Sequence, residues 1–149
     1  MRVLALDYGS VRCGCALSDP TGTIVTPLEV LARPASKRGF ARLRELVRAR
    51  EVERVIVGLP LSLDGSDTDQ TRETRAFARE LSLRLGEGVP VEMHDERFTT
   101  RIAQRMAQPQ RARSRTNTAR RGAGASVLAG EDSRAAAHLL ESWLASQAR

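Results

Sequence analysis

Hydrophobic and polar positions follow two different periods along this chain, and the two periods separate strands from helices. Short apolar or alternating runs, which are typical of strands, come first and then recur between segments with helical spacing. The expected strands cover residues 2–8, 12–18, 23–31, 53–58 and 89–94. The expected helices start at Ser36, run from Thr68 to about Leu85, run from Thr99 or Thr100 to about Pro109, and run from Asp132 or Ser133 to about Gln147.

Turn residues between these runs predict the topology. Tyr8-Gly9-Ser10 is a tight turn that joins the first two strands as a hairpin, and Pro27 places the third strand at an edge or a bulge. Ser36 fits the N-cap of the first helix. Three antiparallel strands followed by alternating helices and strands predict an α/β fold, with a mixed five-stranded sheet flanked by helices.

One segment and the overall composition define the expected domain organisation. Residues 108–130 lack periodicity and are rich in Arg, Ser, Thr, Asn and Gly, so we expect a basic, mobile loop there. A chain of 149 residues with 41% hydrophobic residues fits a single domain over 1–149. Apolar runs such as Val55-Ile56-Val57 are too short to span a membrane, and the acid Asp7 is incompatible with a signal-peptide core. We therefore expect a cytoplasmic protein with no membrane partner.

The positive charge is concentrated in one segment. The formal net charge is +6, from 24 Lys and Arg residues against 18 acids. Residues 97–121 contain eight arginines and no acid, which leaves 16 of the 24 cations against all 18 acids elsewhere. The eight are Arg97, Arg101, Arg105, Arg111, Arg113, Arg115, Arg120 and Arg121. Such a tract indicates a polyanion partner such as nucleic acid, although a solubilising loop fits the composition equally well.

Three acids lie at the ends of predicted elements. Asp7 ends the first strand, Glu96 directly follows the fifth strand, and Asp132 begins the last helix. If the first and fifth strands flank the fourth, Asp7 and Glu96 emerge at the same edge of the sheet, and the last helix adds Asp132. Three neighbouring carboxylates repel one another unless a cation neutralises them. Because hard oxygen ligands suit Mg²⁺ or Mn²⁺, we expect one or two such ions there, an arrangement used for phosphodiester hydrolysis.

Each of these acids also fits a purely structural role. Asp7 could cap the turn of the first hairpin. Glu96 could form a surface ion pair with Arg97 or Arg101. Asp132 could simply be the N-cap of the last helix. The catalytic interpretation therefore depends on the three acids occurring together beside the basic segment.

Small and polar residues near the acids are candidate phosphate contacts. Gly9 and Gly14 could let a phosphate or a metal approach the backbone closely, or could be ordinary hairpin glycines. Ser66 and Thr100 could donate hydrogen bonds to phosphate, or serve only as turn and cap residues. The candidate nucleic-acid-binding residues are Gly9, Ser10, Arg12, Ser66, Arg97, Thr100, Arg101, Arg111, Arg113, Arg115, Arg120 and Arg121.

Other motifs add little chemistry. Cys13 and Cys15 lie on one face of a strand, and we interpret them as reduced core residues, since no further ligand completes a zinc site. The sequence contains neither a Gly-rich phosphate loop followed by Gly-Lys-Ser/Thr nor a Ser/His/Asp set.

Four stretches of the sequence together resemble the YqgF/RuvX family. They are LALDYGSVRCG at 4–14, VGLP at 57–60 with Asp64-Gly65, DERFTT at 95–100 and DSRAA at 132–136. The resemblance implies a ribonuclease H-like fold and a divalent-metal nuclease site, in which Asp7, Glu96 and Asp132 match the metal-binding acids. The chain departs from the family at Arg134, where an apolar residue is usual, and in the Arg- and Gly-rich composition of 108–130.

The resemblance and the residues together predict a metal-dependent endonuclease acting on structured nucleic acid. The family is described both as a nuclease for the 5′ end of pre-16S rRNA and as a Holliday junction resolvase, so RNA and branched DNA are alternative partners. A symmetric junction would require a homodimer, although the sequence shows no clear dimer face. The alternative is a non-catalytic nucleic-acid-binding module of the same fold. A sugar-kinase-like phosphotransferase, suggested by Asp7-Tyr8-Gly9-Ser10, would need a second domain for which the chain has no room.

Overall fold

A computed structural model describes residues 1–97 and 123–148, with only the backbone of 123–129 described. Its strands are β1 (Val3–Asp7), β2 (Arg12–Ser18), β3 (Val25–Pro27), β4 (Leu31–Ala32), β5 (Arg54–Leu59) and β6 (Val91–Asp95). Its helices are α1 (Lys37–Ala49), α2 (Asp69–Leu85) and α4 (Ala123–Gln147). No helix in these described ranges is both long enough and apolar enough to cross a bilayer.

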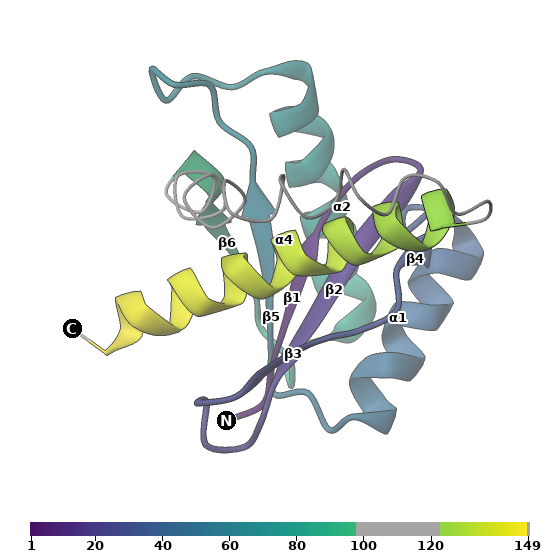
Figure 1. The fold of residues 1–149 in the computed structure, drawn as a ribbon, viewed down its shortest axis with the longest axis vertical. Coiled ribbons are helices and arrows are strands. Elements are labelled where there is room, and N and C mark those ends of the chain that lie inside the picture. The colour runs from purple at the N-terminus through teal and green to yellow at the C-terminus, as the bar shows by residue number, and fades with distance from the viewer. Residues whose placement is uncertain (98–122, 149) are drawn as a thin grey trace.

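The strands form one mixed sheet, as the sequence predicts (Figure 1). Their order is β3-β2-β1-β5-β6, with β4 paired to the other end of β2. β1 is antiparallel to β2 and parallel to β5, and β5 is parallel to β6. β1, which ends at Asp7, and β6, which Glu96 follows, therefore flank β5 and point in the same direction. The sheet has six strands rather than the expected five.

The sixth strand arises because the expected third strand is divided into β3 and β4. Ala16 pairs with Pro27 and Cys13 pairs with Leu31. Moving three residues along β2 therefore corresponds to moving four residues along the segment that contains β3 and β4. One extra residue is thus inserted, as in a β-bulge. Pro27 has no N–H to donate and β3 lies at the edge of the sheet, so both expectations for this proline are confirmed.

Two hydrophobic cores lie on opposite faces of the sheet. Along β1 the side chains alternate, so Leu4 and Leu6 belong to the core beneath α1 and α2, whereas Val3 and Ala5 belong to the core beneath α4. Trp143 of α4 completes the second core. Asp7 continues the alternation of Val3 and Ala5 and therefore lies on the face that α4 covers.

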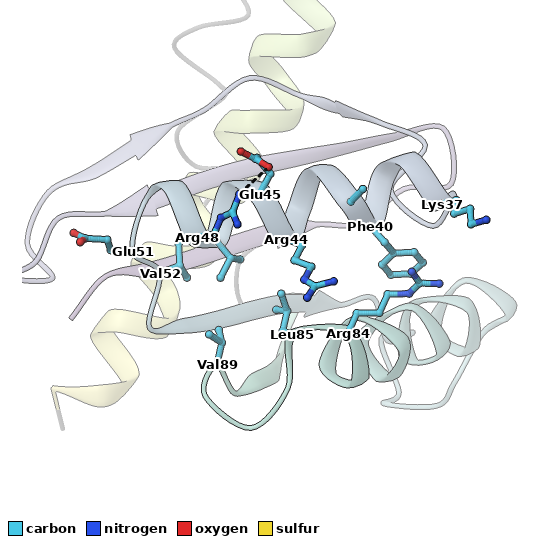
Figure 2. A pocket seen from close by; sticks show the side chains of 12 residues that line it. Lys37, Phe40, Arg44, Glu45, Arg48, Glu51, Val52, Arg84, Leu85 and Val89 are labelled. Atoms are coloured by element: carbon cyan, nitrogen blue, oxygen red, sulfur yellow. Dashed lines mark hydrogen bonds and ion pairs between the residues drawn. The ribbon is translucent and has the colours of Figure 1, made fainter.

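Helices α1 and α2 begin where their capping residues predict. The Ser36 hydroxyl accepts a hydrogen bond from the backbone N–H of Gly39 at 3.0 Å, and Thr68 forms a capping box with Thr71. Gly86, with φ of 80°, ends α2. The two helices lie side by side and leave a groove of about 750 Å³ between them (Figure 2).

The last helix is longer than its sequence pattern indicates. α4 begins at Ala123, so residues 123–130 are helical and the expected loop does not extend to Gly130. Asp132 consequently lies inside the helix, and its interpretation as an N-cap is wrong. Residues 108–122 of the expected loop and the expected helix near 99–109 lie outside the described residues.

Candidate active site

Asp7 and Glu96 meet at the carboxyl-end edge of the sheet. Asp7 is the last residue of β1, and Glu96 directly follows β6, with β5 between the two strands. A hydrogen bond joins their carboxyl groups, which requires one proton to be shared between them. The predicted approach of these two acids at one edge is confirmed.

Helix α4 brings Asp132 to the same region by passing very close to β2. Asp7 pairs with Gly14 across the β1–β2 ladder, and a Cβ on Gly14 would overlap the backbone carbonyl of Asp132. The charge of Asp132 is near enough to raise the pKa of Asp7. The Asp132 Oδ2 atom lies 3.5 Å from Nε of Arg12, which forms an ion pair with it.

Burial and mutual repulsion perturb the two contacting acids. Burial is the main cause that raises the pKa of Glu96 to about 8, and the negative charge of Asp7 adds to it. Burial likewise raises the pKa of Asp7 above its usual range, while the hydrogen bond from Glu96 opposes the rise. Oδ2 of Asp132 is buried and has no hydrogen-bond partner among the described residues. These carboxylates thus lie close enough together for the charge of Asp7 to raise the pKa of Glu96, and for the charge of Asp132 to raise the pKa of Asp7.

A divalent cation fits this set of groups. Hard carboxylate oxygens, one of them a buried acceptor without a donor, suit Mg²⁺ or Mn²⁺. Within residues 1–97 and 123–148, however, no three His, Cys, Asp or Glu side chains lie close enough together to hold an ion. Asp7 and Glu96 are in contact, whereas the Asp132 carboxylate is paired with Arg12, so ligation by all three acids requires the Asp132 carboxylate to move closer to the other two.

We expect the metal-free protein to lose thermal stability between about pH 5 and pH 8. The pKa of Glu96 rises from 4.5 to about 8 on folding, so the folded protein binds more protons than the unfolded chain in this range. The free energy of unfolding therefore falls as the pH rises. One unit of pKa corresponds to about 1.4 kcal/mol. Thermal unfolding with EDTA at several pH values measures the loss, and Mn²⁺ should restore the stability at pH 8. Glu96→Gln should flatten the dependence; a slope equal to that of the parent protein would contradict this assignment.

Two glycines make room for the acids. A Cβ on Gly58 of β5 would overlap Oε1 of Glu96 and lie 2.8 Å from its Cγ. Gly14 admits the backbone of α4, so the expectation that it leaves space for a phosphate or metal is wrong. A Cβ on Gly9 would lie 2.6 Å from the backbone oxygen of Arg12, so the turn itself explains this glycine, and its contact with nucleic acid stays a prediction. Sequence reasoning missed Gly58, because no short-range pattern relates it to Glu96.

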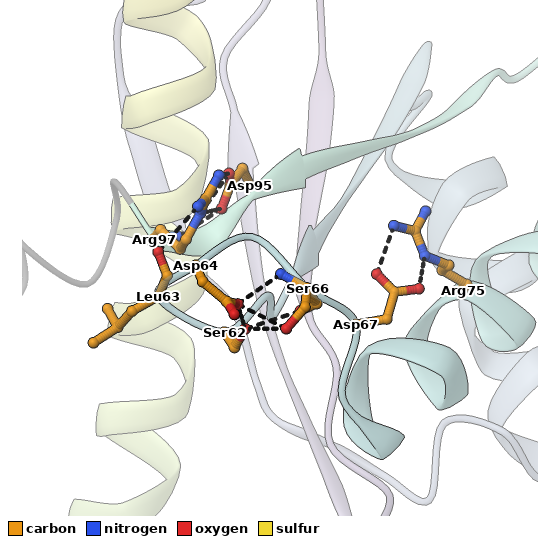
Figure 3. Close-up of polar contacts among 8 residues, drawn as sticks. All are labelled: Ser62, Leu63, Asp64, Ser66, Asp67, Arg75, Asp95 and Arg97. Carbon is orange, nitrogen blue, oxygen red and sulfur yellow. Dashed lines mark hydrogen bonds and ion pairs between the residues drawn. The ribbon is translucent and has the colours of Figure 1, made fainter.

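Arg97 and Ser66 contribute to a loop network beside the acids (Figure 3). The Arg97 guanidinium pairs with Asp95 at 2.6 Å and donates to the carbonyl of Leu63 at 3.3 Å. The Ser66 hydroxyl donates to Asp64 at 2.7 Å within the same loop. In this state both residues position the loop against the end of β6, and their contact with nucleic acid stays a prediction.

The remaining candidate residues fall into two groups. Ser10 and Arg12 are exposed in the first hairpin, next to Asp7 and Asp132. Thr100, Arg101, Arg111, Arg113, Arg115, Arg120 and Arg121 lie outside the described residues. Cys13 and Cys15 are buried free thiols, as expected.

The fold has counterparts among known nucleases. The fowlpox virus resolvase, solved with Holliday junction DNA, matches with a TM-score of 0.55 and 10% identity over the full length of both chains. The fold is thus ribonuclease H-like, as predicted. A family model described as RuvX, a Holliday junction resolvase, matches residues 1–146. The chain belongs to the RuvX family, which confirms the resemblance and the nuclease class.

Two relatives illustrate the range of the family. A protein of Mycobacteroides abscessus is 40% identical over 99% of this chain and 83% of its own length. A protein of Anaeromyxobacter sp. (strain Fw109-5) is 38% identical over 97% of this chain and 96% of its own length. Both are named provisionally as pre-16S rRNA nucleases.

Proposed function

We propose that residues 1–149 form one nuclease domain that hydrolyses phosphodiester bonds in structured nucleic acid with the help of Mg²⁺ or Mn²⁺. The observation that carries the proposal is the half-buried Asp7–Glu96 contact at the carboxyl ends of β1 and β6, with Asp132 beside it. These three acids would hold one or two ions. Bound divalent ions supply an activated water and stabilise the leaving oxygen in phosphodiester hydrolysis.

The protein's own groups prepare this site. Asp7 and Glu96 share a proton in the metal-free state, and that proton must leave before both carboxylates can act as ligands. Arg12 supplies the positive charge next to Asp132, at 3.5 Å. When Asp132 takes up its role as a ligand, the Arg12 guanidinium becomes available to a substrate phosphate from its exposed position on the hairpin.

The names in the family give two candidate substrates, namely precursor 16S rRNA and a four-way DNA junction. Arginines that bind phosphate do not distinguish RNA from DNA, so both follow from the same site chemistry. Paired cleavage of a symmetric junction would need a homodimer, whereas trimming of an RNA end would not. The homodimer and the cytoplasmic location stay predictions.

Cleavage of both substrates in parallel tests the proposal. Pre-16S leader RNA and a synthetic four-way junction are incubated with the protein in Mg²⁺, in Mn²⁺ and in EDTA. We expect metal-dependent cleavage of at least one substrate and none in EDTA. Cleavage of neither, together with a Mn²⁺ titration that gives no heat and no thermal shift, would support the alternative of a non-catalytic binding module.

A further inference from the structure

A second basic segment surrounds helix α1, far in sequence from the arginines of 97–121. Residues 33–50 contain seven cations and one acid, Glu45. The seven are Arg33, Lys37, Arg38, Arg42, Arg44, Arg48 and Arg50, and all are exposed. The opposite side of α1, with Phe40, Leu43 and Val47, packs into the core, so the charges are confined to the outer face of the helix. This surface is called the α1 basic face below.

The cations of the α1 basic face have few acidic partners. Arg48 pairs with Glu45 at 3.4 Å, whereas the other six form no ion pair in the described part of the chain. Helix α2 differs, because three of its four cations, Arg72, Arg75 and Arg84, each pair with a nearby acid in the helix or in the loop before it. The excess charge on α1 is therefore not used to stabilise the fold through ion pairs.

The groove between α1 and α2 extends this face. Lys37, Arg44 and Arg84 line it, and the Arg84 guanidinium lies 4.5 Å from the centre of the Phe40 ring (Figure 2). Its two acids are already neutralised, since Glu45 pairs with Arg48 and Glu51 pairs with Arg2 at 3.1 Å. A groove with cations on its rim and paired acids favours an anionic occupant.

The basic face begins at the edge of the sheet where the candidate acids lie. Arg12, the partner of Asp132, pairs with Ala32 of β4, and the backbone N–H of Arg33 donates to the carbonyl of Val11 at 2.9 Å. Helix α1 starts a few residues later and runs toward the other end of the strands, where β1 and β5 begin. At 1.5 Å per residue, Lys37 to Arg48 covers about 16 Å, or roughly five base pairs at 3.4 Å each. Exposed cations thus run from the hairpin that carries Arg12 along the α1 side of the sheet, the face opposite to α4.

We infer that the α1 basic face is a docking surface for the phosphate backbone of the nucleic acid, outside the cleavage site itself. The inference rests on the proposed function, because it assigns to the same substrate a second contact that leads away from Arg12. Contacts of this kind hold a duplex in register without reading its sequence. They also make the affinity strongly dependent on salt, since each neutralised phosphate releases counterions.

Binding by charge-matched variants tests this inference. The first variant combines Lys37→Gln, Arg44→Gln and Arg48→Gln, and the control combines Arg72→Gln, Arg75→Gln and Arg79→Gln on α2, so both lose three positive charges. Fluorescence anisotropy with a labelled duplex, in EDTA to prevent cleavage, gives the affinity as a function of salt. If the first variant loses three phosphate contacts, its slope of log affinity against log salt concentration becomes shallower by about 2.7. The ratio of the duplex affinity of the parent protein to that of the first variant then falls about fortyfold between about 50 and 200 mM salt.

Several outcomes would overturn the inference. Equal losses in both variants would mean that only the net charge matters, and an unchanged slope in the first variant would mean that α1 makes no contact. A first variant that keeps duplex binding but no longer binds vesicles of anionic lipid would assign the face to a membrane surface. Failure of the nuclease proposal is separate: a parent protein that binds through α1 without cutting either substrate refutes cleavage and leaves this docking surface standing.

A measurement on the unmodified protein covers the case in which a variant does not fold. An arginine-selective reagent, followed by peptide mass mapping, compares modification with and without the duplex. Arg44 and Arg48 should be protected by the duplex, whereas Arg72 and Arg79 of α2 should react equally in both samples. Equal reaction of the α1 arginines with and without the duplex would overturn the inference.

Discussion

Replacing Asp7 with asparagine is expected to abolish cleavage while leaving nucleic-acid binding close to that of the parent protein. Asparagine keeps the size of the side chain but removes the negative charge of the proposed metal ligand, whose carboxyl contacts Glu96 and lies near the charge of Asp132. We expect the rate to fall at least about a thousandfold, which corresponds to about 4 kcal/mol of transition-state stabilisation. Single-turnover cleavage in Mg²⁺ and in Mn²⁺ measures the loss, and anisotropy in EDTA measures binding.

A matched control separates the loss of a ligand from damage to the fold. Asp69→Asn makes the same chemical change at an exposed acid on α2 and should leave cleavage unchanged. Asp7→Asn should also melt at the same temperature as the parent protein or higher, because it removes one of two contacting, half-buried carboxyls. A stable Asp7→Asn protein that cuts at the parent rate would show that Asp7 is not a metal ligand, and would remove the basis of the proposed site.

The parts of the fold that local patterns determine could be predicted from the sequence. Strand alternation and helical spacing gave the order of the elements, and Ser36 and Thr68 marked two helix starts because an N-cap is a local interaction. The parallel run of strands also placed Asp7 and Glu96 at one edge, since carboxyl ends of parallel strands coincide. These inferences need no knowledge of long-range packing.

The errors occurred where distant segments decide the structure. The start of α4 at Ala123 precedes any strong amphipathic pattern, so Asp132 looked like a cap rather than an interior residue. The positive charge of α1 was also missed. In a net charge summed along the chain, the excess of cations at 33–50 is offset by the acids of 51–96. The fold separates these groups in space, so the surplus becomes a surface property that a sum along the sequence cannot show.

Gly14→Ala is expected to cause the largest loss of stability among substitutions at the site. The added Cβ would overlap the backbone carbonyl of Asp132 and lie 3.1 Å from the backbone nitrogen of Ser133. Backbone atoms cannot rotate away, so helix α4 must shift as a whole from the sheet. Overpacking of this kind costs about 1–3 kcal/mol or more, which for a chain of this size lowers the melting temperature by roughly 2–12 °C.

Two further alanine substitutions identify the cause of that loss. Gly130→Ala lies on the same helix with nothing within 4 Å of the added Cβ, so it should raise stability slightly through helix propensity. Gly58→Ala meets the Glu96 side chain, which can rotate away. It should therefore cost less stability than Gly14→Ala yet still impair cleavage, because Glu96 is moved from Asp7. If Gly14→Ala instead melts like the parent protein, α4 does not lie against β2 at this point, and Asp132 cannot reach Asp7 in the way the structure indicates.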